Sequence, residues 1–326
     1  METYVSKEKQ KEPKRNKMKK SVLLIAIILT ALVGHSQTIY SKAYGDPSHE
    51  ALIFLHGGPG YNAIGFEATT ASILADNGFY VVVYDRRGEG RSLDANAKFT
   101  FQETFDDLNG IYEKYHLTKA TLIGHSFGGI VGTLFAEKNP SKVHALVLVG
   151  APVSLQETFT NIISRSKTIY QDNQDDNNLK YIGMLEQMDK TSLPYSSYCF
   201  GHAMQNGFYF PKAPTKEALG IYAKLQADTT FRGGAAKMTM EAPKGFWENE
   251  SYTTIDMTQN LKNAMKNGTP VFAMYGVEDG LYSKEQVMEV EQLVSTSHFK
   301  YFENCSHNVF MDQQEAFMVA LKTWIK

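Results

Sequence analysis

The chain is poor in several features that mark large classes of protein. Only two of its 326 residues are cysteine, too few for the disulfide framework on which small exported domains depend. Its 33 lysines and arginines are balanced by 35 aspartates and glutamates, so it has no basic field that could hold a nucleic acid. The nine histidines are scattered, and neither cysteine has neighbours typical of a zinc site. We therefore expect no bound metal and no nucleic-acid partner.

A hydrophobic run long enough to cross a membrane is also missing near the start of the chain. The apolar segment Ser21–Val33 is shorter than the ~20 residues that a membrane-spanning helix needs. It follows a lysine-rich stretch and precedes the small residues Gly34 and Ser36, which is the order of parts in a secretory signal. We expect a signal peptide over residues 1–36 and an exported protein, periplasmic or secreted, with no membrane span after processing. Met18 is an alternative start, and an uncleaved segment would anchor the protein in a membrane.

What the sequence does contain is a regular alternation of short apolar runs and longer amphipathic stretches. The apolar runs, rich in Val, Ile and Leu, predict buried strands; they are Ala51–Leu55, Tyr80–Tyr84, Ala120–Ile123, Val143–Val149, Pro270–Tyr275 and Phe299–Phe302. The amphipathic stretches predict helices; they are Glu67–Asn77, Phe101–Tyr115, Phe127–Lys138, Ser283–Leu293 and Gln313–Ile325. Strands separated by helices imply a mostly parallel sheet flanked by helices.

The middle of the chain loses this alternation. Residues 152–266 lack Val-rich runs and are instead polar and rich in Phe and Tyr. We interpret them as a mainly helical cap inserted before the strand Pro270–Tyr275 and lying over the end of the sheet. The predicted domain order is therefore a core over 37–151, the cap over 152–266, and the rest of the core over 267–326.

The strongest chemical signal is a G-x-S-x-G motif at Gly124–Gly128. It follows a predicted strand and opens a predicted helix, which is the setting in which this motif carries a nucleophile. Such a turn is strained and needs small residues two places before and after the serine, where Gly124 and Gly128 stand. The Ser126 hydroxyl would then be exposed at a helix N-terminus, where developing negative charge is favoured. The strand–turn–helix setting argues against a chance match in a glycine-rich turn.

A nucleophilic serine needs a base, and the base needs an acid to orient it. On this kind of elbow both partners follow the serine along the chain, in the order acid then histidine. Asp279 comes just after the strand Pro270–Tyr275, and His307 just after Phe299–Phe302. Catalytic groups gather in loops at the carboxyl ends of parallel strands, so we predict that His307 is the general base and Asp279 its acidic partner.

Other residues compete for these roles. Glu278 is an alternative acid, because the position of the acid depends on loop geometry that sequence does not give. His298 precedes its strand and would lie at the wrong end of it. His125 is adjacent to Ser126, but its place in the elbow directs it elsewhere, which favours a structural role.

A glycine-rich loop, His56–Gly60, comes directly after the strand Ala51–Leu55. Glycines let backbone N–H groups approach a ligand without obstruction, so the N–H groups of Gly58 and Phe127 are predicted to form an oxyanion hole. A tight surface turn is the alternative; a phosphate loop is disfavoured because no phosphate-binding motif is present. His56 is expected to brace the loop rather than react.

Another turn, Asp85–Ser92, carries three arginines and two carboxylates directly after the strand Tyr80–Tyr84. We favour a mutually satisfied network of charges with a structural role. The alternative is an anion-binding rim for substrate.

Together these segments resemble the α/β-hydrolase superfamily, and in particular the branch that contains the proline iminopeptidases. His56–Gly60 is similar to the HGGPG loop of that branch, and Asp85–Ser92 to its D-x-R-G-x-G-x-S turn. Tyr275–Asp279 and Cys305–His307 are similar to its acid and histidine loops. The resemblance covers residues 39–150 and 270–326. It implies an eight-stranded, mostly parallel sheet with a helical cap, and hydrolysis without a cofactor.

The chain departs from that branch at the elbow, where Gly124-His125-Ser126-Phe127-Gly128 has the form shared by esterases. The peptidases hold the free amino group of the substrate with cap glutamates. Here Glu248, among aromatic residues, is a candidate because a carboxylate beside aromatics suits an ammonium group, although a surface glutamate is the simpler interpretation.

The predicted function is therefore hydrolysis of an ester or amide of a small molecule or short peptide, by an aminopeptidase or a carboxylesterase. An epoxide hydrolase or dehalogenase would need a carboxylate where Ser126 stands. A non-catalytic ligand-binding protein on the same fold is a further alternative, although such a protein has no need to keep a triad and an oxyanion loop together.

Overall fold

A seven-stranded sheet forms the centre of the molecule, with its strands in the order β1-β3-β2-β4-β5-β6-β7. The computed structural model describes residues 1–4, 39–235 and 237–325. Every neighbouring pair of strands is parallel except β1 and β3, which are antiparallel. The strands are β1 (Ser41–Tyr44), β2 (Glu50–Leu55), β3 (Phe79–Tyr84), β4 (Ala120–His125), β5 (Val143–Val149), β6 (Val271–Gly276) and β7 (Phe299–Phe302).

Helices cover both faces of this sheet, and most of those in the core lie close to where the sequence predicts them. The helices Thr258–Lys266, inside the range predicted for the cap, and Val309–Asp312 were not predicted as core helices. The segment α2 (Ile64–Phe66), the π-helical turn η1 (Glu67–Ala71) and α3 (Ser72–Asp76) run on from one another, so this helical stretch starts three residues earlier than expected. The other core helices are α4 (Phe101–Lys114), α5 (Phe127–Lys138), α12 (Thr258–Lys266), α13 (Lys284–Val294), α14 (Val309–Asp312) and α15 (Gln314–Ile325). Short 3₁₀ turns stand at η2 (Pro140–Lys142), η3 (Tyr252–Thr254) and η4 (Thr296–His298).

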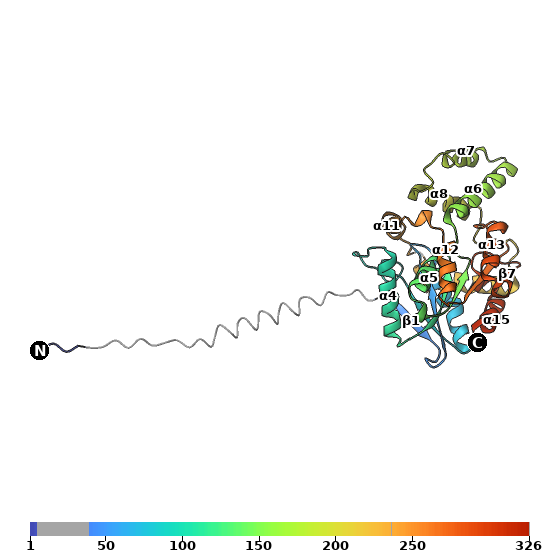
Figure 1. Cartoon of the computed structure of the whole chain (residues 1–326). Coiled ribbons are helices and arrows are strands. Elements are labelled where there is room, and N and C mark those ends of the chain that lie inside the picture. Colours follow the sequence, from blue (N-terminus) through green and yellow to red (C-terminus); the bar gives the residue numbers. More distant parts are fainter. Residues whose placement is uncertain (5–38, 236, 326) are drawn as a thin grey trace. The chain divides into compact units, whose positions relative to one another are not determined.

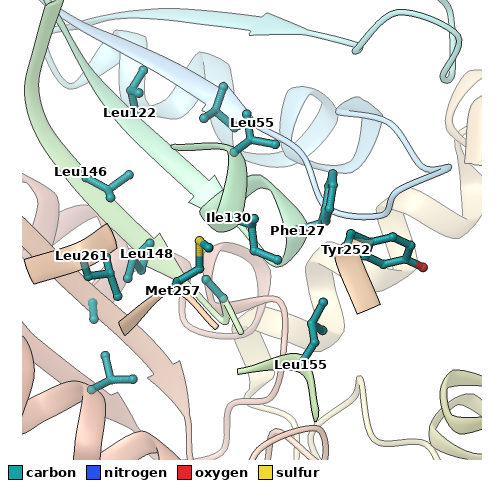
Figure 2. Packing of buried hydrophobic residues seen from close by; sticks show 14 of the residues in the cluster. Leu55, Leu122, Phe127, Ile130, Leu146, Leu148, Leu155, Tyr252, Met257 and Leu261 are labelled. Atoms are coloured by element: carbon teal, nitrogen blue, oxygen red, sulfur yellow. The ribbon is translucent and has the colours of Figure 1, made fainter. Parts of the chain in front are cut away.

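The alternation of side chains along each strand divides the core in two. In β2, Ile53 and Leu55 point to one face, whereas Leu52 and Phe54 point to the other. Because both sets are buried, the strand has no polar face, which explains its continuous apolar run. Figure 2 shows the first face, where Leu55, Leu122, Leu146 and Leu148 of the strands meet Ile130 of α5 and Leu261 of α12. The parallel sheet covered by helices on both faces confirms the predicted fold class.

The chain leaves the sheet after β5 and returns before α12, and the residues between them are helical. A single antiparallel bridge between Ser154 and Asp256 closes the base of this excursion. Its helices are α6 (Leu155–Asp172), α7 (Asp176–Leu185), α8 (Leu193–Gln205), α9 (Lys216–Ala227), α10 (Thr229–Ala235) and α11 (Glu241–Glu250). In Figure 1, α6, α7 and α8 lie together above the part that contains the sheet. We call residues 155–250 the cap helices; the domain boundaries at 151/152 and 266/267 remain predictions.

Two sequence-based expectations need comment. The expected eight strands are wrong for the residues described, which form seven, because only one antiparallel strand, β1, precedes β2 there. The proposed signal peptide, residues 1–36, falls almost wholly outside the described residues. Within the described ranges, no helix combines the length and apolar character that crossing a bilayer requires.

Candidate active site

Ser126 stands on a sharp turn between β4 and α5. Its backbone has φ 51° and ψ −126°, a conformation that a residue with a side chain adopts rarely and only where the surroundings impose it. The Ser126 N–H donates to the Val149 carbonyl of β5 at 3.0 Å, and the Ser126 carbonyl accepts from Gly129 N–H at 2.8 Å. The side chain is half-buried, so the turn presents a hydroxyl beside the start of α5 that solvent and ligands can reach.

The two glycines of the motif are required by close packing. A Cβ atom on Gly128 would lie 2.0 Å from the Leu55 carbonyl oxygen, and one on Gly124 would lie 2.6 Å from Gly129 Cα. Both neighbours are backbone atoms, which cannot move aside as a flexible side chain would. The sequence spacing of the motif therefore follows from the narrow space between β2, β4 and α5.

His307 and Asp279, which are 28 residues apart in sequence, form a buried pair. Nδ1 of His307 lies 2.9 Å from Oδ2 of Asp279, and the other carboxylate oxygen accepts the Leu281 N–H at 3.0 Å. A carboxylate can only accept, so Nδ1 carries a proton, and in the neutral ring the free lone pair therefore belongs to Nε2. This is the tautomer that a general base acting through Nε2 requires.

Aromatic side chains surround the His307 ring. The rings of His125, Tyr209 and Tyr282 have centroids 4.9, 5.2 and 6.2 Å from it. His125 also holds the loop, because its Nε2–H donates to the His307 carbonyl at 3.2 Å. Burial, helped by nearby His307, lowers the pKa of His125 well below its usual value, so this ring is neutral and structural. The residue before Ser126 thus contacts the histidine loop directly.

The predicted oxyanion loop lies against Ser126. A Cβ on Gly57 would be 3.1 Å from Ser126 Cβ, so this loop and the elbow are in contact. Gly58 has φ +116°, which favours glycine because a side chain there would be strained. Phe127 is the first residue of α5, where backbone N–H groups have no partner within the helix. Both predicted donors therefore sit on segments that flank Ser126.

A buried ion pair holds the oxyanion loop from beneath. The guanidinium of Arg86 donates to the carbonyls of His56 and Gly57 at 2.5 and 2.7 Å and to Glu89 at 2.9 and 3.0 Å. Glu89 in turn accepts the Gly60 N–H at 2.7 Å. The two side chains are 2% and 0% exposed, so this pair fixes both ends of the loop with little access for water.

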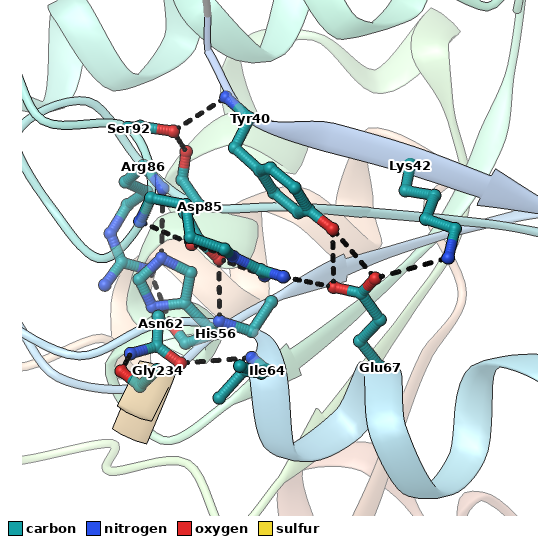
Figure 3. Close-up of polar contacts among 12 residues, drawn as sticks. Tyr40, Lys42, His56, Asn62, Ile64, Glu67, Asp85, Arg86, Ser92 and Gly234 are labelled. Atoms are coloured by element: carbon teal, nitrogen blue, oxygen red, sulfur yellow. Dashed lines mark hydrogen bonds and ion pairs between the residues drawn. The ribbon is translucent and has the colours of Figure 1, made fainter. Parts of the chain in front are cut away.

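His56 braces the same loop, as the sequence predicts. Its Nε2 accepts the Arg86 N–H at 3.0 Å, which leaves Nδ1 as the donor to the Gly57 carbonyl at 2.8 Å. Burial and the Arg86 charge lower the pKa of His56 to about 3, so the ring stays neutral. Figure 3 shows His56 beside Arg86 and Asp85.

The other two arginines of this turn are also satisfied. Arg87 pairs with Asp107 and Asp94, and Arg91 pairs with Asp85 and Glu67. The structure therefore favours the structural interpretation of Asp85–Ser92 over an anion-binding rim, because the charges neutralise one another.

The Arg86 pair gives a prediction about stability. Arg86→Ala leaves the Glu89 carboxylate buried without its partner, so the free energy of unfolding should fall by about 3–5 kcal/mol. Urea denaturation followed by circular dichroism measures it. The control is Lys244→Ala, which removes a pair on the surface of α11 and should cost no more than about 1 kcal/mol. Equal stability of Arg86→Ala and wild type would contradict the assigned bracing.

The two other acidic candidates from the sequence, Glu278 and Glu248, bond to groups other than His307. The Glu278 carboxylate accepts the backbone N–H of Lys212 from the cap, so the structure pairs His307 with Asp279 and not with Glu278. Glu248 is exposed on α11, with its carboxylate 3.7 Å from Lys244 Nζ. Among the described residues, Glu248 has no hydrogen bond or ion pair to Ser126, His307 or Asp279.

Some residues at the site gave no signal in the sequence. Tyr209 of the cap packs against His307, and Arg165 of α6 donates to the Asp279 carbonyl at 3.3 Å. Asp312, which closes α14, is fully buried and bonds to the loop of His307. Arg165 contacts a residue 114 positions away and Asp312 one that is six positions away, but no local sequence pattern marks any of the three residues. The cysteines, Cys199 and Cys305, are buried and unpaired, and no metal-binding cluster occurs in the part of the chain described.

Comparison with known proteins agrees with this geometry. The model of the alpha/beta hydrolase fold family matches residues 50–314, so the chain belongs to that family. A proline iminopeptidase from Lactobacillus acidophilus is 24% identical over 291 residues, which cover 84% of this chain and 89% of the relative. Shorter matches, at 31% identity, span about 28% of the length of the curated relatives concerned.

Solved structures show the same fold. The proline iminopeptidase-related protein from Thermus thermophilus superposes with a TM-score of 0.60 at 23% identity, covering 87% of this chain and 92% of that one. An esterase from Exiguobacterium antarcticum gives 0.59 at 20% identity, with 88% and 94% covered. The similarity to the proline iminopeptidase branch, inferred from the loops, is thereby confirmed.

Proposed function

We propose that the protein is a serine hydrolase that cleaves an ester or amide through an acyl-enzyme. Ser126 is the nucleophile, His307 the general base and Asp279 the acid that orients it. The observation that carries this proposal is the 2.9 Å contact between His307 Nδ1 and Asp279 Oδ2, because it directs the other ring nitrogen, Nε2, to the role of base on a loop that contacts the elbow of Ser126.

The proposed reaction uses these groups as follows. As Ser126 Oγ attacks the substrate carbonyl, its proton passes to His307 Nε2, and Asp279 stabilises the imidazolium. The carbonyl oxygen gains negative charge, which the N–H groups of Gly58 and Phe127 would bind. His307 then gives its proton to the departing alcohol or amine. Water, activated by the same histidine, hydrolyses the acyl-enzyme and restores the serine. No step needs a cofactor.

Two substrate classes fit this chemistry. Similarity of the loops and of the relatives to proline iminopeptidases favours release of an N-terminal residue from a small peptide. The position of Glu248 favours the second candidate, a carboxylesterase, because an exposed glutamate already paired with Lys244 is a poor holder for an amino group. A small acyl ester needs no such anchor.

The test combines a covalent probe with a substrate panel. The protein used would begin at Gln37, the residue after the proposed signal peptide, since we also propose that the chain is exported. A fluorophosphonate should add one phosphonyl group, and peptide mass mapping should place it on Ser126. The panel compares aryl amides of proline, alanine and leucine with short acyl esters.

The results distinguish a peptidase, an esterase and a non-catalytic binding protein. Turnover of prolyl amides identifies the peptidase, and turnover confined to esters identifies the esterase. Glu248→Gln should leave the KM for amides unchanged if the glutamate is a surface residue. Absence of both labelling and turnover would refute the hydrolase and favour a non-catalytic binding protein.

A further inference from the structure

One buried carboxylate connects the histidine loop to the cap helices. Asp312 is 0% exposed and ends α14, the short helix that follows His307. One carboxylate oxygen accepts the backbone N–H of Ser306 at 2.7 Å. The other accepts the hydroxyl of Tyr222, which belongs to cap helix α9. Asp312 thus bridges the residue that precedes His307 and a residue 90 positions away in the cap.

A second contact fixes the same helix to the same place. Thr215, the N-cap of α9, accepts the Ala218 N–H at 3.0 Å and donates its hydroxyl to the Asp312 carbonyl at 3.3 Å. Thr215 and Tyr222 are seven residues apart, which places both on one side of the helix. The first two turns of α9 are therefore attached to Asp312 at two points.

Ser306 is also tied to the cap through its side chain. Its hydroxyl donates to the Phe208 carbonyl at 2.9 Å, and that carbonyl accepts the Gly280 N–H at 2.9 Å as well. The residue before His307 and the residue after Asp279 are thus both hydrogen-bonded to Phe208, which precedes Tyr209, whose ring packs on His307.

We propose that Asp312 is a positioning residue through which cap helix α9 sets the place of His307. The inference rests on the proposed function, because it assigns Asp312 a part in that reaction without contact with the substrate. The position of His307 then depends on the cap as well as on the sheet.

The environment of Asp312 supports a positioning role over simple packing. Burial raises the pKa of Asp312 to about 6, although its hydrogen bonds from Tyr222 and Ser306 and the nearby His307 oppose the rise. A buried carboxyl group is costly to the fold, and an apolar side chain would fill the space more cheaply. An apolar side chain, however, could not accept hydrogen bonds from two donors on different segments, as Asp312 does.

The test breaks the hydrogen bond between Tyr222 and Asp312 from the cap side, so that the rest of the fold is disturbed as little as possible. Tyr222→Phe removes one hydroxyl from a half-buried position on α9 and leaves Asp312 and Ser306 intact. The matched control is Tyr198→Phe, which removes a hydroxyl from an exposed tyrosine on α8. Asp312→Ala removes both acceptors. Asp312→Asn should preserve the bridge, since the asparagine side-chain carbonyl can accept the Ser306 N–H and its NH₂ can donate to the Tyr222 hydroxyl.

Two measurements are made on each variant. The first is the rate of fluorophosphonate labelling of Ser126 at saturating probe. Because an error of about 1 Å in placement can cost about 100-fold, we expect Tyr222→Phe and Asp312→Ala to label roughly 10-fold more slowly or worse, with the half-saturating probe concentration unchanged. The second is amide hydrogen exchange in the peptide that covers residues 303–310, which should be faster in both.

The outcomes distinguish this inference from the proposed function. Slower labelling and faster exchange in Tyr222→Phe, with Tyr198→Phe and Asp312→Asn close to wild type, support the positioning role. Wild-type labelling and exchange in Tyr222→Phe and Asp312→Ala overturn it. Absence of labelling in the wild type refutes the hydrolase and, with it, any catalytic role for Asp312, whereas exchange still reports whether the bridge exists.

Discussion

Ser126→Ala is expected to lower kcat/KM for any substrate of the wild type by about 10⁴- to 10⁶-fold. The variant loses the oxygen atom that forms the acyl bond in the proposed mechanism, while the predicted oxyanion loop and the His307–Asp279 pair stay in place. Removal of a triad member elsewhere leaves a residual rate from the oxyanion hole and from binding, so the loss should stop short of the uncatalysed rate. Steady-state turnover of the best substrate in the panel measures it.

A suitable control for this variant exists within the chain. Ser295 also has a positive φ, 78°, and its hydroxyl bonds to Ser297 at the surface. Ser295→Ala therefore repeats the chemical change and the backbone strain away from the site, and it should keep wild-type turnover. A Ser126→Ala protein that retains more than about a hundredth of the activity, at equal thermal stability, would be incompatible with a serine nucleophile.

Asp279→Asn is expected to lower kcat by about 10⁴-fold with little change in structure. The Leu281 N–H already donates to one oxygen of Asp279, so the asparagine carbonyl would take that place and its NH₂ would face His307 Nδ1. The ring would then accept at Nδ1 and carry its proton on Nε2, where it could no longer take the proton of Ser126. Turnover of the variant and the wild type, measured side by side at several pH values, shows whether the loss persists when the pH is changed.

The neighbouring carboxylate provides the comparison. Glu278→Gln changes the same charge one residue earlier, where the side chain accepts a cap N–H and not the histidine. We expect its kcat to stay within about 10-fold of wild type. The reverse result, with Glu278→Gln inactive and Asp279→Asn active, would assign the acid to Glu278.

The strands and the site loops were predictable from the sequence because both depend on local patterns. A strand buried on both faces must be continuously apolar, as β3 is, and a serine elbow of this kind must place glycines where Gly124 and Gly128 stand. The positions of Asp279 and His307 followed from the order of strands, since each loop begins where a strand ends.

The contacts between the cap and the core could not be predicted from the sequence, for a physical reason. Its helices pack on the core through apolar side chains, as Phe246 does against Phe127. The contacts around His307, however, come from single polar atoms, such as the hydroxyl of Tyr222 or the carbonyl of Phe208. Neither residue type nor spacing marks such atoms in advance. Glu248 was chosen for its aromatic neighbours, yet Lys244, one helical turn earlier, is the partner that the structure records.

The burial of the Arg86–Glu89 pair has a consequence for the conditions under which the protein can work. Ions in solution screen charges that they can approach, with a range of about 8 Å at physiological ionic strength, and they screen buried pairs much less. Dilute and saline surroundings should therefore leave the Gly57–Gly60 backbone equally well placed. Stabilisation of a charged transition state by this loop should therefore change little with the ionic strength of the medium.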